Sequence, residues 1–279
     1  MSLKGKTILV TGSTDGVGRF VAERLAADGA EAIVHGRDRA RGESLVQRIR
    51  KAGGEARFFR ADFASLAEVK SFASAVRRSA HHIDVLVNNA GIGSAGQGRQ
   101  ESRELSADGF ELRFAVNYLA PFLLTRLLLP WLERAKEARI VNVASAGQQA
   151  IDFSDVMLER GYSGARAYRQ SKLAQILFTF DLAEELDSRP ITVNSLHPAT
   201  FMDTTMVRRA GVKPISTVEE GGAAILKLVA SPALADVSGR YFDGLKEARA
   251  DPQAYDKSAR KRLRALSFEL AGMPDPLAA

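Results

Sequence analysis

The stretch Thr11-Gly-Ser-Thr-Asp-Gly-Val-Gly18 decides the fold of this chain. It follows the short apolar run 6–11, which is typical of a buried parallel strand, and it precedes a helical pattern that begins near residue 20. Glycines let the backbone bend tightly and approach a pyrophosphate, while the first N–H groups of the helix attract negative charge. The stretch therefore predicts a dinucleotide-binding turn between a strand and a helix.

The second expected strand, 31–35, leads into Gly36 and Arg37. In dinucleotide-binding folds an acidic residue at this point binds the ribose 2′-hydroxyl, whereas an arginine accommodates a 2′-phosphate. We therefore interpret the pocket as one for NADP(H), with NAD(H) as the less favoured alternative. Asp38 is expected to cap the next helix. Two arginines of that helix are interpreted as solvated charges: Arg39 and Arg41.

Strands and helices keep alternating, which predicts an α/β fold with a Rossmann-type, doubly wound parallel sheet flanked by helices. The further expected strands are 56–60, 84–88, 139–145, 191–196 and 239–242, and the expected helices are 40–51, 66–79, 108–134, about 168–186, 218–229 and 254–270. Segment 147–164 has both loop and helical character. No linker or repeat divides the chain. We therefore expect one domain over 1–279: about 1–105 mainly binds cofactor, about 106–250 carries catalysis and substrate, and about 251–279 is a helical tail.

Composition excludes several classes of protein. The chain has 279 residues, of which 46% are hydrophobic and 26% charged, as expected for a globular protein. It has no cysteine, which excludes disulfides, thiolate nucleophiles and cysteine–zinc sites, and its four histidines lack metal-binding spacing, so no metal is expected. The net charge of +6 comes from scattered arginines, which argues against nucleic-acid binding.

The N-terminal residues do not resemble a signal peptide, because the chain enters its first strand directly. The most apolar run, 119–132, contains Pro121, Arg126 and Pro130 and is too short to span a bilayer. We expect it to form a core helix. These features predict a cytoplasmic protein that does not associate with a membrane.

Tyr168 and Lys172 lie four positions apart at the start of an apolar helical pattern, so they are neighbours on one helix face. An ammonium favours the tyrosinate form, so we expect Lys172 to lower the pKa of the phenol. The tyrosine can then exchange a proton with a substrate hydroxyl or carbonyl near neutral pH. Such pairs also arise by chance on many helices, so other motifs must decide.

The chain resembles the short-chain dehydrogenase/reductase family over nearly its whole length. Five patterns occur in the family's order and spacing: Thr11–Gly18, Asn88-Asn-Ala-Gly91, Asn117, Ser145 and Tyr168-Arg-Gln-Ser-Lys172. Within the family, Val116-Asn-Tyr-Leu-Ala-Pro-Phe-Leu-Leu-Thr125 is similar to the retinol-dehydrogenase/WW-oxidoreductase-like branch. The resemblance implies hydride transfer between NADP(H) and a carbonyl or alcohol of bulky, apolar character. It also implies a homodimer or homotetramer, while a monomer capped by its own tail remains open.

The resemblance implies roles for four catalytic residues. Tyr168 would be the general acid/base, and Lys172 would lower its pKa and hold the nicotinamide ribose. Ser145 would hydrogen-bond the substrate oxygen and stabilise the developing alkoxide. Asn117 would interrupt its helix locally and carry a water that links Lys172 to solvent.

The resemblance also implies a set of cofactor contacts, from the pyrophosphate turn to the nicotinamide end. The set is Gly12, Ser13, Thr14, Asp15, Gly16, Val17, Gly18, Gly36, Arg37, Asp62, Phe63, Asn89, Ala90, Gly91, Tyr168, Lys172, Pro198, Thr200 and Phe201. One departure concerns the loop after 196. Ala199 replaces the family's usual glycine, and Asp203 stands where a threonine is usual, with Thr204 next. Because Ala reaches positive φ less cheaply than Gly, we expect this loop to differ in shape or closure.

Other functions remain as alternatives. A non-catalytic NADP(H)-binding sensor would keep the glycine turn but would usually lose the Tyr/Lys pair, which is intact here. An NAD-dependent alcohol dehydrogenase would require a different interpretation of Arg37. The glycine spacing and the lack of a large C-terminal substrate domain argue against an epimerase or dehydratase of the related longer family. The substrate is expected to be selected by loops 93–98, 148–163 and 201–214.

Overall fold

A computed structural model describes residues 3–94 and 102–277, so part of the expected substrate loop 93–98 lies outside the described residues. The described residues form an eight-stranded sheet in the order β3-β2-β1-β4-β5-β6-β7-β8. The strands are β1 Thr7–Val10, β2 Glu31–Gly36, β3 Glu55–Arg60, β4 Val85–Asn88, β5 Ala138–Val143, β6 Ile191–His197, β7 Arg240–Asp243 and β8 Lys246–Ala248. Neighbouring strands pair in parallel, except the antiparallel pair β7–β8. The predicted doubly wound parallel sheet is confirmed.

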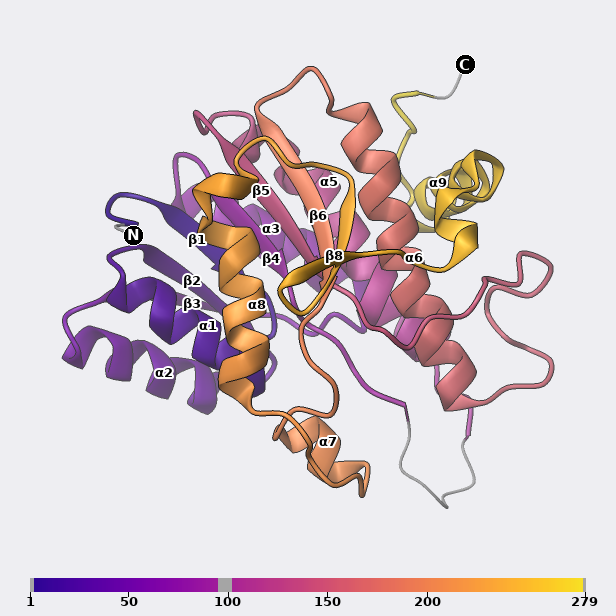
Figure 1. Cartoon of the computed structure of the whole chain (residues 1–279), viewed down its shortest axis with the longest axis horizontal. Helices are drawn as coiled ribbons and strands as arrows, with labels where there is room; N and C mark the ends of the chain where they lie inside the picture. Colours follow the sequence, from indigo (N-terminus) through magenta and orange to yellow (C-terminus); the bar gives the residue numbers. More distant parts are fainter. Residues whose placement is uncertain (1–2, 95–101, 278–279) are drawn as a thin grey trace.

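Helices cover both faces of the sheet (Figure 1). Those of at least five residues are α1 Gly16–Ala27, α2 Arg39–Lys51, α3 Leu66–Ser79, α5 Ala120–Leu132, α6 Gly164–Glu185, α7 Thr205–Arg209, α8 Val218–Ala230 and α9 Lys257–Ala271, together with the π-helical η1 Ala115–Leu119. α1 and α8 pack on one apolar core, while α3, α5 and α6 pack on the other. The strands between them are buried on both sides, which explains their continuous apolar sequence.

The helical run that carries Asn117 covers Leu112–Leu132 and is shorter at both ends than the expected helix 108–134. It begins at Leu112, where the carboxylate of Glu111 accepts a hydrogen bond from the Phe114 N–H at 2.7 Å. The π-helical η1 interrupts it around Asn117, as predicted. Among the described helices this run, Leu112–Leu132, is long and apolar enough to cross a membrane by length and composition, but it is mostly buried inside the protein. It packs as the core helix that we expected.

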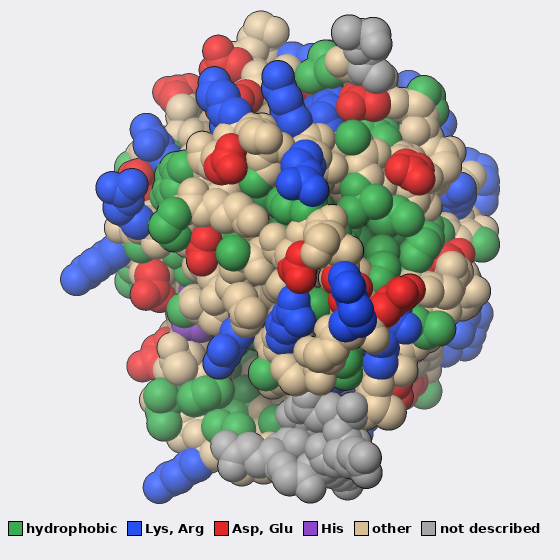
Figure 2. Space-filling view, turned by 90° about the vertical axis from the view of Figure 1, so that its right-hand side faces the viewer, with side chains coloured by type: hydrophobic (Ala, Val, Ile, Leu, Met, Phe, Trp, Pro, Cys, Tyr) green, Lys and Arg blue, Asp and Glu red, His purple; other side chains and the backbone are tan. Residues whose placement is uncertain are grey.

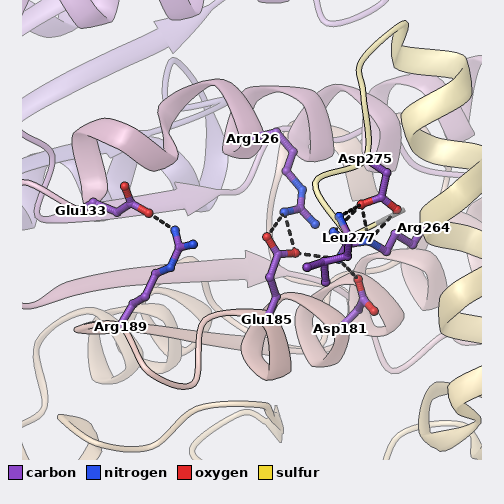
Figure 3. A network of polar contacts seen from close by, with 8 residues as sticks. All are labelled: Arg126, Glu133, Asp181, Glu185, Arg189, Arg264, Asp275 and Leu277. Carbon is purple, nitrogen blue, oxygen red and sulfur yellow. Dashed lines mark hydrogen bonds and ion pairs between the residues drawn. The ribbon is translucent and has the colours of Figure 1, made fainter. Parts of the chain in front are cut away.

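The tail forms α9, which packs against α6 (Figure 1). Arg264 of α9 binds Asp181 and Glu185 of α6, with contacts of 3.0 and 2.6 Å, and Asp275 of the tail, at 2.7 Å (Figure 3). Arg126 of α5 contacts the same Glu185 at 2.7 Å. Burial opposes the charge of Arg264, but these carboxylates outweigh it and raise the pKa of its guanidinium. The tail is therefore fastened to the core by a partly buried ionic cluster.

Charged side chains elsewhere are dispersed. On the face seen in Figure 2, lysines and arginines are interspersed with acidic side chains, with hydrophobic side chains between them. This agrees with the scattered charge expected from the sequence. It gives a nucleic acid no concentrated basic patch on that face.

Several short elements, among them β8 and α7, were not predicted, and the expectation for segment 147–164 was partly wrong. β8 has only three residues and no apolar alternation, and α7 interrupts a segment that was expected to be a loop. Segment 147–163 contains bends and turns but no helix, so its helical character was overestimated. These elements depend on contacts with distant parts of the chain more than on local periodicity.

Candidate active site

A pocket of about 570 Å³ lies where β1, β2 and β4 end. The glycine turn forms its floor. A Cβ added to Gly12, whose φ is +62°, would lie 2.7 Å from the Cα of Ala90, and one added to Gly18 would lie 2.4 Å from the carbonyl oxygen of Gly12. Side chains are thus excluded where the backbone must approach a pyrophosphate, and the N-terminus of α1 faces the same space. The residues present fit a dinucleotide.

His35, which the sequence analysis did not single out, holds this turn in place. Its Nδ1 accepts a hydrogen bond from the Gly12 N–H at 3.0 Å, and its Nε2 lies 3.2 Å from the carbonyl oxygen of Ala61. The imidazole stacks on Phe63 with ring centroids 4.2 Å apart. Burial lowers the pKa of His35 to about 4, so the ring is neutral and can accept at one nitrogen while it donates at the other. Its position inside an apolar strand was the available signal.

At the end of β2 there is no room for an acidic side chain. A Cβ added to Gly36 would lie 2.5 Å from both the Oγ1 and the Cγ2 of Thr14. Arg37 lies beside the pocket, 3.8 Å from a carboxylate oxygen of Asp62. Arg41 also lines the pocket, 3.4 Å from Asp15, so its interpretation as a purely solvated charge was wrong. Arg39 fits that interpretation, because it pairs with Glu43 on the helix surface at 3.4 Å.

Most of the predicted cofactor contacts line this pocket: Gly12, Thr14, Asp15, Gly16, Val17, Gly18, Gly36, Arg37, Asp62, Phe63, Asn89, Ala90 and Gly91. Ser13 does not. Its side chain is fully buried, donates to the carbonyl oxygen of Val10 at 2.7 Å and accepts from the His35 N–H at 3.0 Å. Ser13 therefore supports the turn from behind.

A second pocket, of about 510 Å³, continues the first and shares Val17, Asn89 and Gly91 with it. It is lined by the remaining predicted contacts: Tyr168, Lys172, Pro198, Thr200 and Phe201. Ser145 follows the end of β5 and also lines it. The sheet thus brings catalytic candidates that are far apart in sequence to one edge, where ligands bind in open α/β sheets.

The side chains of Ser145 and Tyr168 lie side by side in this pocket. Burial raises the pKa of Tyr168, and the interaction with Ser145 opposes this rise. Our expectation that Lys172 would lower this pKa was wrong for this structure. The Nζ of Lys172 lies 5.9 Å from the centroid of the Tyr168 ring, and burial lowers the pKa of Lys172 itself to about 7.

Lys172 is instead held by two oxygen atoms. Its Nζ donates to the carbonyl oxygen of Val143 at 2.8 Å and to the Oε1 of Gln175 at 3.1 Å. A Cβ added to Gly91 would lie 3.5 Å from this Nζ and 3.2 Å from the Oδ1 of Asn117, so the bare backbone of Gly91 lies against both side chains. Nothing in the sequence alone singles out Gln175.

Asn117 does not line either pocket. Its Oδ1 accepts from the Ile92 N–H at 2.8 Å, and its Nδ2 donates to the Ile92 carbonyl at 3.1 Å and to the Oγ of Ser171 at 3.0 Å. Asn117 thereby fixes Ile92, which lines both pockets, and ties η1 to α6. Its role in a water relay to Lys172 stays a prediction.

In the loop after β6, residues near Ala199 and Asp203 take over the roles that the family pattern places at those two positions. Positive φ occurs at Phe201 (44°), not at Ala199. Asp203 turns away and pairs with Arg208, with its carboxylate 2.5 Å from the guanidinium Nε. Thr204 lines both pockets and caps α7 through its hydroxyl. Thr204 therefore lines the pocket, whereas Asp203 does not.

Comparison with known proteins agrees with this geometry. A family model described as "short chain dehydrogenase" matches residues 6–213. Human retinol dehydrogenase 13 is 36% identical over 99% of this chain and 87% of its own length. Dehydrogenase/reductase SDR family member 13 from Bos taurus is 35% identical over 98% of this chain and 74% of its own.

Solved structures give the same result. An uncharacterized protein from Mycobacterium Paratuberculosis superposes with a TM-score of 0.80 at 30% identity, covering 99% of this chain and 97% of that one. A short chain dehydrogenase from Escherichia coli CFT073 complexed with NADPH has a TM-score of 0.71 at 25% identity, covering 87% of this chain and 97% of that one. This chain belongs to the retinol-dehydrogenase-like branch of the short-chain dehydrogenase/reductase family, whose members are oxidoreductases acting on alcohols and carbonyls with a nicotinamide dinucleotide.

Proposed function

We propose that the protein is an NADP(H)-dependent oxidoreductase that interconverts a carbonyl and a primary or secondary alcohol of bulky, mainly apolar character. The observation that carries this proposal is the neighbouring pair Ser145–Tyr168, placed in a pocket that continues the glycine-lined groove. A sensor that only binds the dinucleotide has no need of paired hydroxyl groups at that junction. The walls formed by Phe201, Met206 and Val212 favour an apolar substrate.

The preference for NADP(H) rests on the end of β2. The acid that would bind a ribose 2′-hydroxyl has no room at Gly36, and the guanidinium groups of Arg37 and Arg41 are at the pocket. Both arginines pair with exposed carboxylates, and such pairs are weak enough to be exchanged for a phosphate. Arg209 of α7 adds a third cation to the lining.

The residues of the second pocket supply the proton chemistry. A bound nicotinamide dinucleotide supplies or accepts the hydride. Tyr168 donates its hydroxyl proton to the carbonyl oxygen, and its raised pKa keeps that proton in place until an oxygen with developing negative charge accepts it. Ser145 hydrogen-bonds the same oxygen and then the phenolate that remains.

Lys172 supplies the proton that Tyr168 must regain. With a pKa of about 7 its ammonium is present near neutral pH but is readily deprotonated, so it can pass a proton back to Tyr168. For alcohol oxidation the same steps run in reverse. Gln175 and the carbonyl of Val143 keep the ammonium directed to this side of the helix.

Oxidation of NADPH and of NADH, followed at 340 nm against a panel of ketones, aldehydes and quinones, tests the proposal. We expect turnover with at least one apolar carbonyl and a higher kcat/KM for NADPH. A higher kcat/KM for NADH would overturn the cofactor preference. Arg37→Gln should raise the KM for NADPH about tenfold through loss of a charge-assisted contact, while Arg39→Gln, outside the pocket, is the matched control.

The variant Tyr168→Phe separates the enzyme from the sensor. It removes the transferable proton and leaves the glycine turn untouched, so turnover should fall by at least about a hundredfold while the Kd for NADPH changes little. Tight NADPH binding with no turnover of any carbonyl by the unmodified protein would favour the sensor.

The proposed assembly is a homodimer or homotetramer, as the family resemblance implies. α9 covers part of α6, and its Phe268 also packs on Phe122 of α5 at 5.1 Å between ring centroids. Copies of the chain would therefore pair through a surface that α9 leaves open or through α9 itself. Light scattering after size exclusion tests this, and a mass near the 30.2 kDa of one chain would overturn it.

A further inference from the structure

The second pocket contains an imbalance of charge. Its lining includes two cations, Arg169 and Lys172, but no aspartate or glutamate among the described residues. The first pocket differs, because its arginines are matched by three carboxylates: Asp15, Asp38 and Asp62. Nothing in the described lining of the second pocket neutralises its positive charge.

The ammonium of Lys172 already has hydrogen-bond partners. It is buried, donates to Val143 and Gln175, and lies beside Tyr168, where the proton chemistry requires it. His197 is not a further cation, because burial lowers its pKa and its Nε2 lies 3.0 Å from the Oγ1 of Thr200. The unneutralised charge therefore belongs to Arg169.

Arg169 follows the catalytic tyrosine directly and its stem lies beside the reacting groups. A Cβ added to Gly147 would contact the Oγ of Ser145 at 3.4 Å, the ring of Tyr168 at 3.8 Å and the Cγ of Arg169 at 3.9 Å. Arg169 is an exposed residue in the lining of this pocket, and among the described residues it forms no ion pair with a carboxylate within 4.0 Å. Arg166, one turn earlier, shows the usual arrangement, since it pairs with Asp152 at 3.0 Å.

We propose that Arg169 binds an anionic group of the substrate. The substrate is then a carbonyl or alcohol with an apolar body and a carboxylate or a comparable anion near the reacting carbon. A planar guanidinium matches a carboxylate with two parallel hydrogen bonds, and apolar walls strengthen the contact relative to open water. A substrate without an anion would leave this cation facing an apolar molecule. The inference deepens the proposed function of the same pocket and rests on it.

Binding without turnover gives the first test. The probes are a biphenyl carboxylate and the corresponding primary carboxamide, titrated calorimetrically into the protein saturated with NADP⁺. We expect the acid to bind about tenfold more tightly than the amide, as for a partly shielded charge-assisted contact. Arg169→Gln should abolish this difference, and Arg169→Lys should keep part of it. Arg24→Gln removes an exposed arginine of α1 that lines neither pocket, so it should leave the difference intact.

Turnover gives the second test and separates the two proposals. The kcat/KM with NADPH is measured for an aromatic keto acid and for its methyl ester. The unmodified protein should have the higher kcat/KM for the acid, and Arg169→Gln should have similar values for both compounds. Reduction of the ester without preference for the acid would overturn this inference and leave the proposed function standing. Binding of the acid that depends on Arg169, with no turnover of either compound, would support the inference and count against the proposed function. Equal binding of acid and amide, or binding of neither, would overturn the inference.

Discussion

Gln175 accepts a hydrogen bond from the Lys172 ammonium, with 3.1 Å between its Oε1 and the lysine Nζ, and both side chains are buried. The amide Nε2 of Gln175 has no protein partner, so within the described structure this side chain serves Lys172 alone. An oxygen dipole next to the ammonium favours the charged form of the lysine. Gln175 thus positions Lys172 without itself lining the pocket.

Replacement of Gln175 should shift the pH dependence of the reaction. Gln175→Leu removes the accepting oxygen and should move the Lys172 pKa further down, whereas Gln175→Glu places a carboxylate there and should move it up. The pH profile of kcat/KM with NADPH measures these shifts. Opposite displacements of the lysine-dependent limb are expected, and identical profiles in the two variants would contradict a positioning role.

Lys172 should make the protein more stable as pH rises from about 7 to about 10.5. Its pKa falls from 10.5 in the unfolded chain to about 7 in the folded one because of burial, so between these values the unfolded chain binds more protons. The free energy of unfolding therefore increases with pH in this window and does not depend on this group below it. Lys172→Met should flatten the slope, as measured by urea unfolding at several pH values. Lys70→Met, exposed on α3, should retain it.

His35 should make the protein lose stability in acid. Its pKa is about 4 in the folded chain and 6.5 in the unfolded one, so protonation favours unfolding as pH falls through this interval. A shift of this size corresponds to about 3 kcal/mol below pH 4. Thermal unfolding between pH 7 and pH 4 should show the loss. His35→Leu should be less stable at pH 7, because the Gly12 N–H loses its acceptor, but should have a shallower acid limb. Exposed His81→Leu is the control, and an unchanged acid limb in His35→Leu would exclude His35 as the cause.

Loss of Arg264 should destabilise the whole domain. Arg264→Leu would leave the carboxylates of Asp181, Glu185 and Asp275 close together without their shared cation, which we expect to cost about 3–5 kcal/mol. Chemical denaturation followed by circular dichroism measures this cost. Lys261→Leu, on the exposed side of α9, is the control. A loss below 1 kcal/mol in Arg264→Leu would show that the cluster contributes little.

The parts of the fold that follow local rules could be predicted from the sequence. The strands around the glycine turn are continuous apolar runs, and α3 and α8 have capping residues and a clear helical period, so their bounds agree closely with expectation. The set Ser145, Tyr168 and Lys172 was found through its order and spacing. Its position at one sheet edge follows from parallel topology.

The residues that were missed act across the chain. His35 is bonded to Gly12, 23 positions away, and Arg41 reaches Asp15, 26 positions away. Neither relationship leaves a periodic signal. The expected effect of Lys172 on Tyr168 failed for a related reason. Burial lowers the pKa of Lys172, and its ammonium donates to the Val143 carbonyl, and neither is visible in a four-residue spacing.

The contact of Gly36 with Thr14 has a consequence for how this protein could evolve. Any side chain at position 36 would enter the space that Thr14 occupies, because even a Cβ would lie 2.5 Å from the threonine hydroxyl oxygen. A single Gly36→Asp change would therefore force the Thr14 side chain to move. An acid at position 36 therefore needs Thr14 to shift or to be replaced by a smaller residue, so we expect positions 14 and 36 to change together.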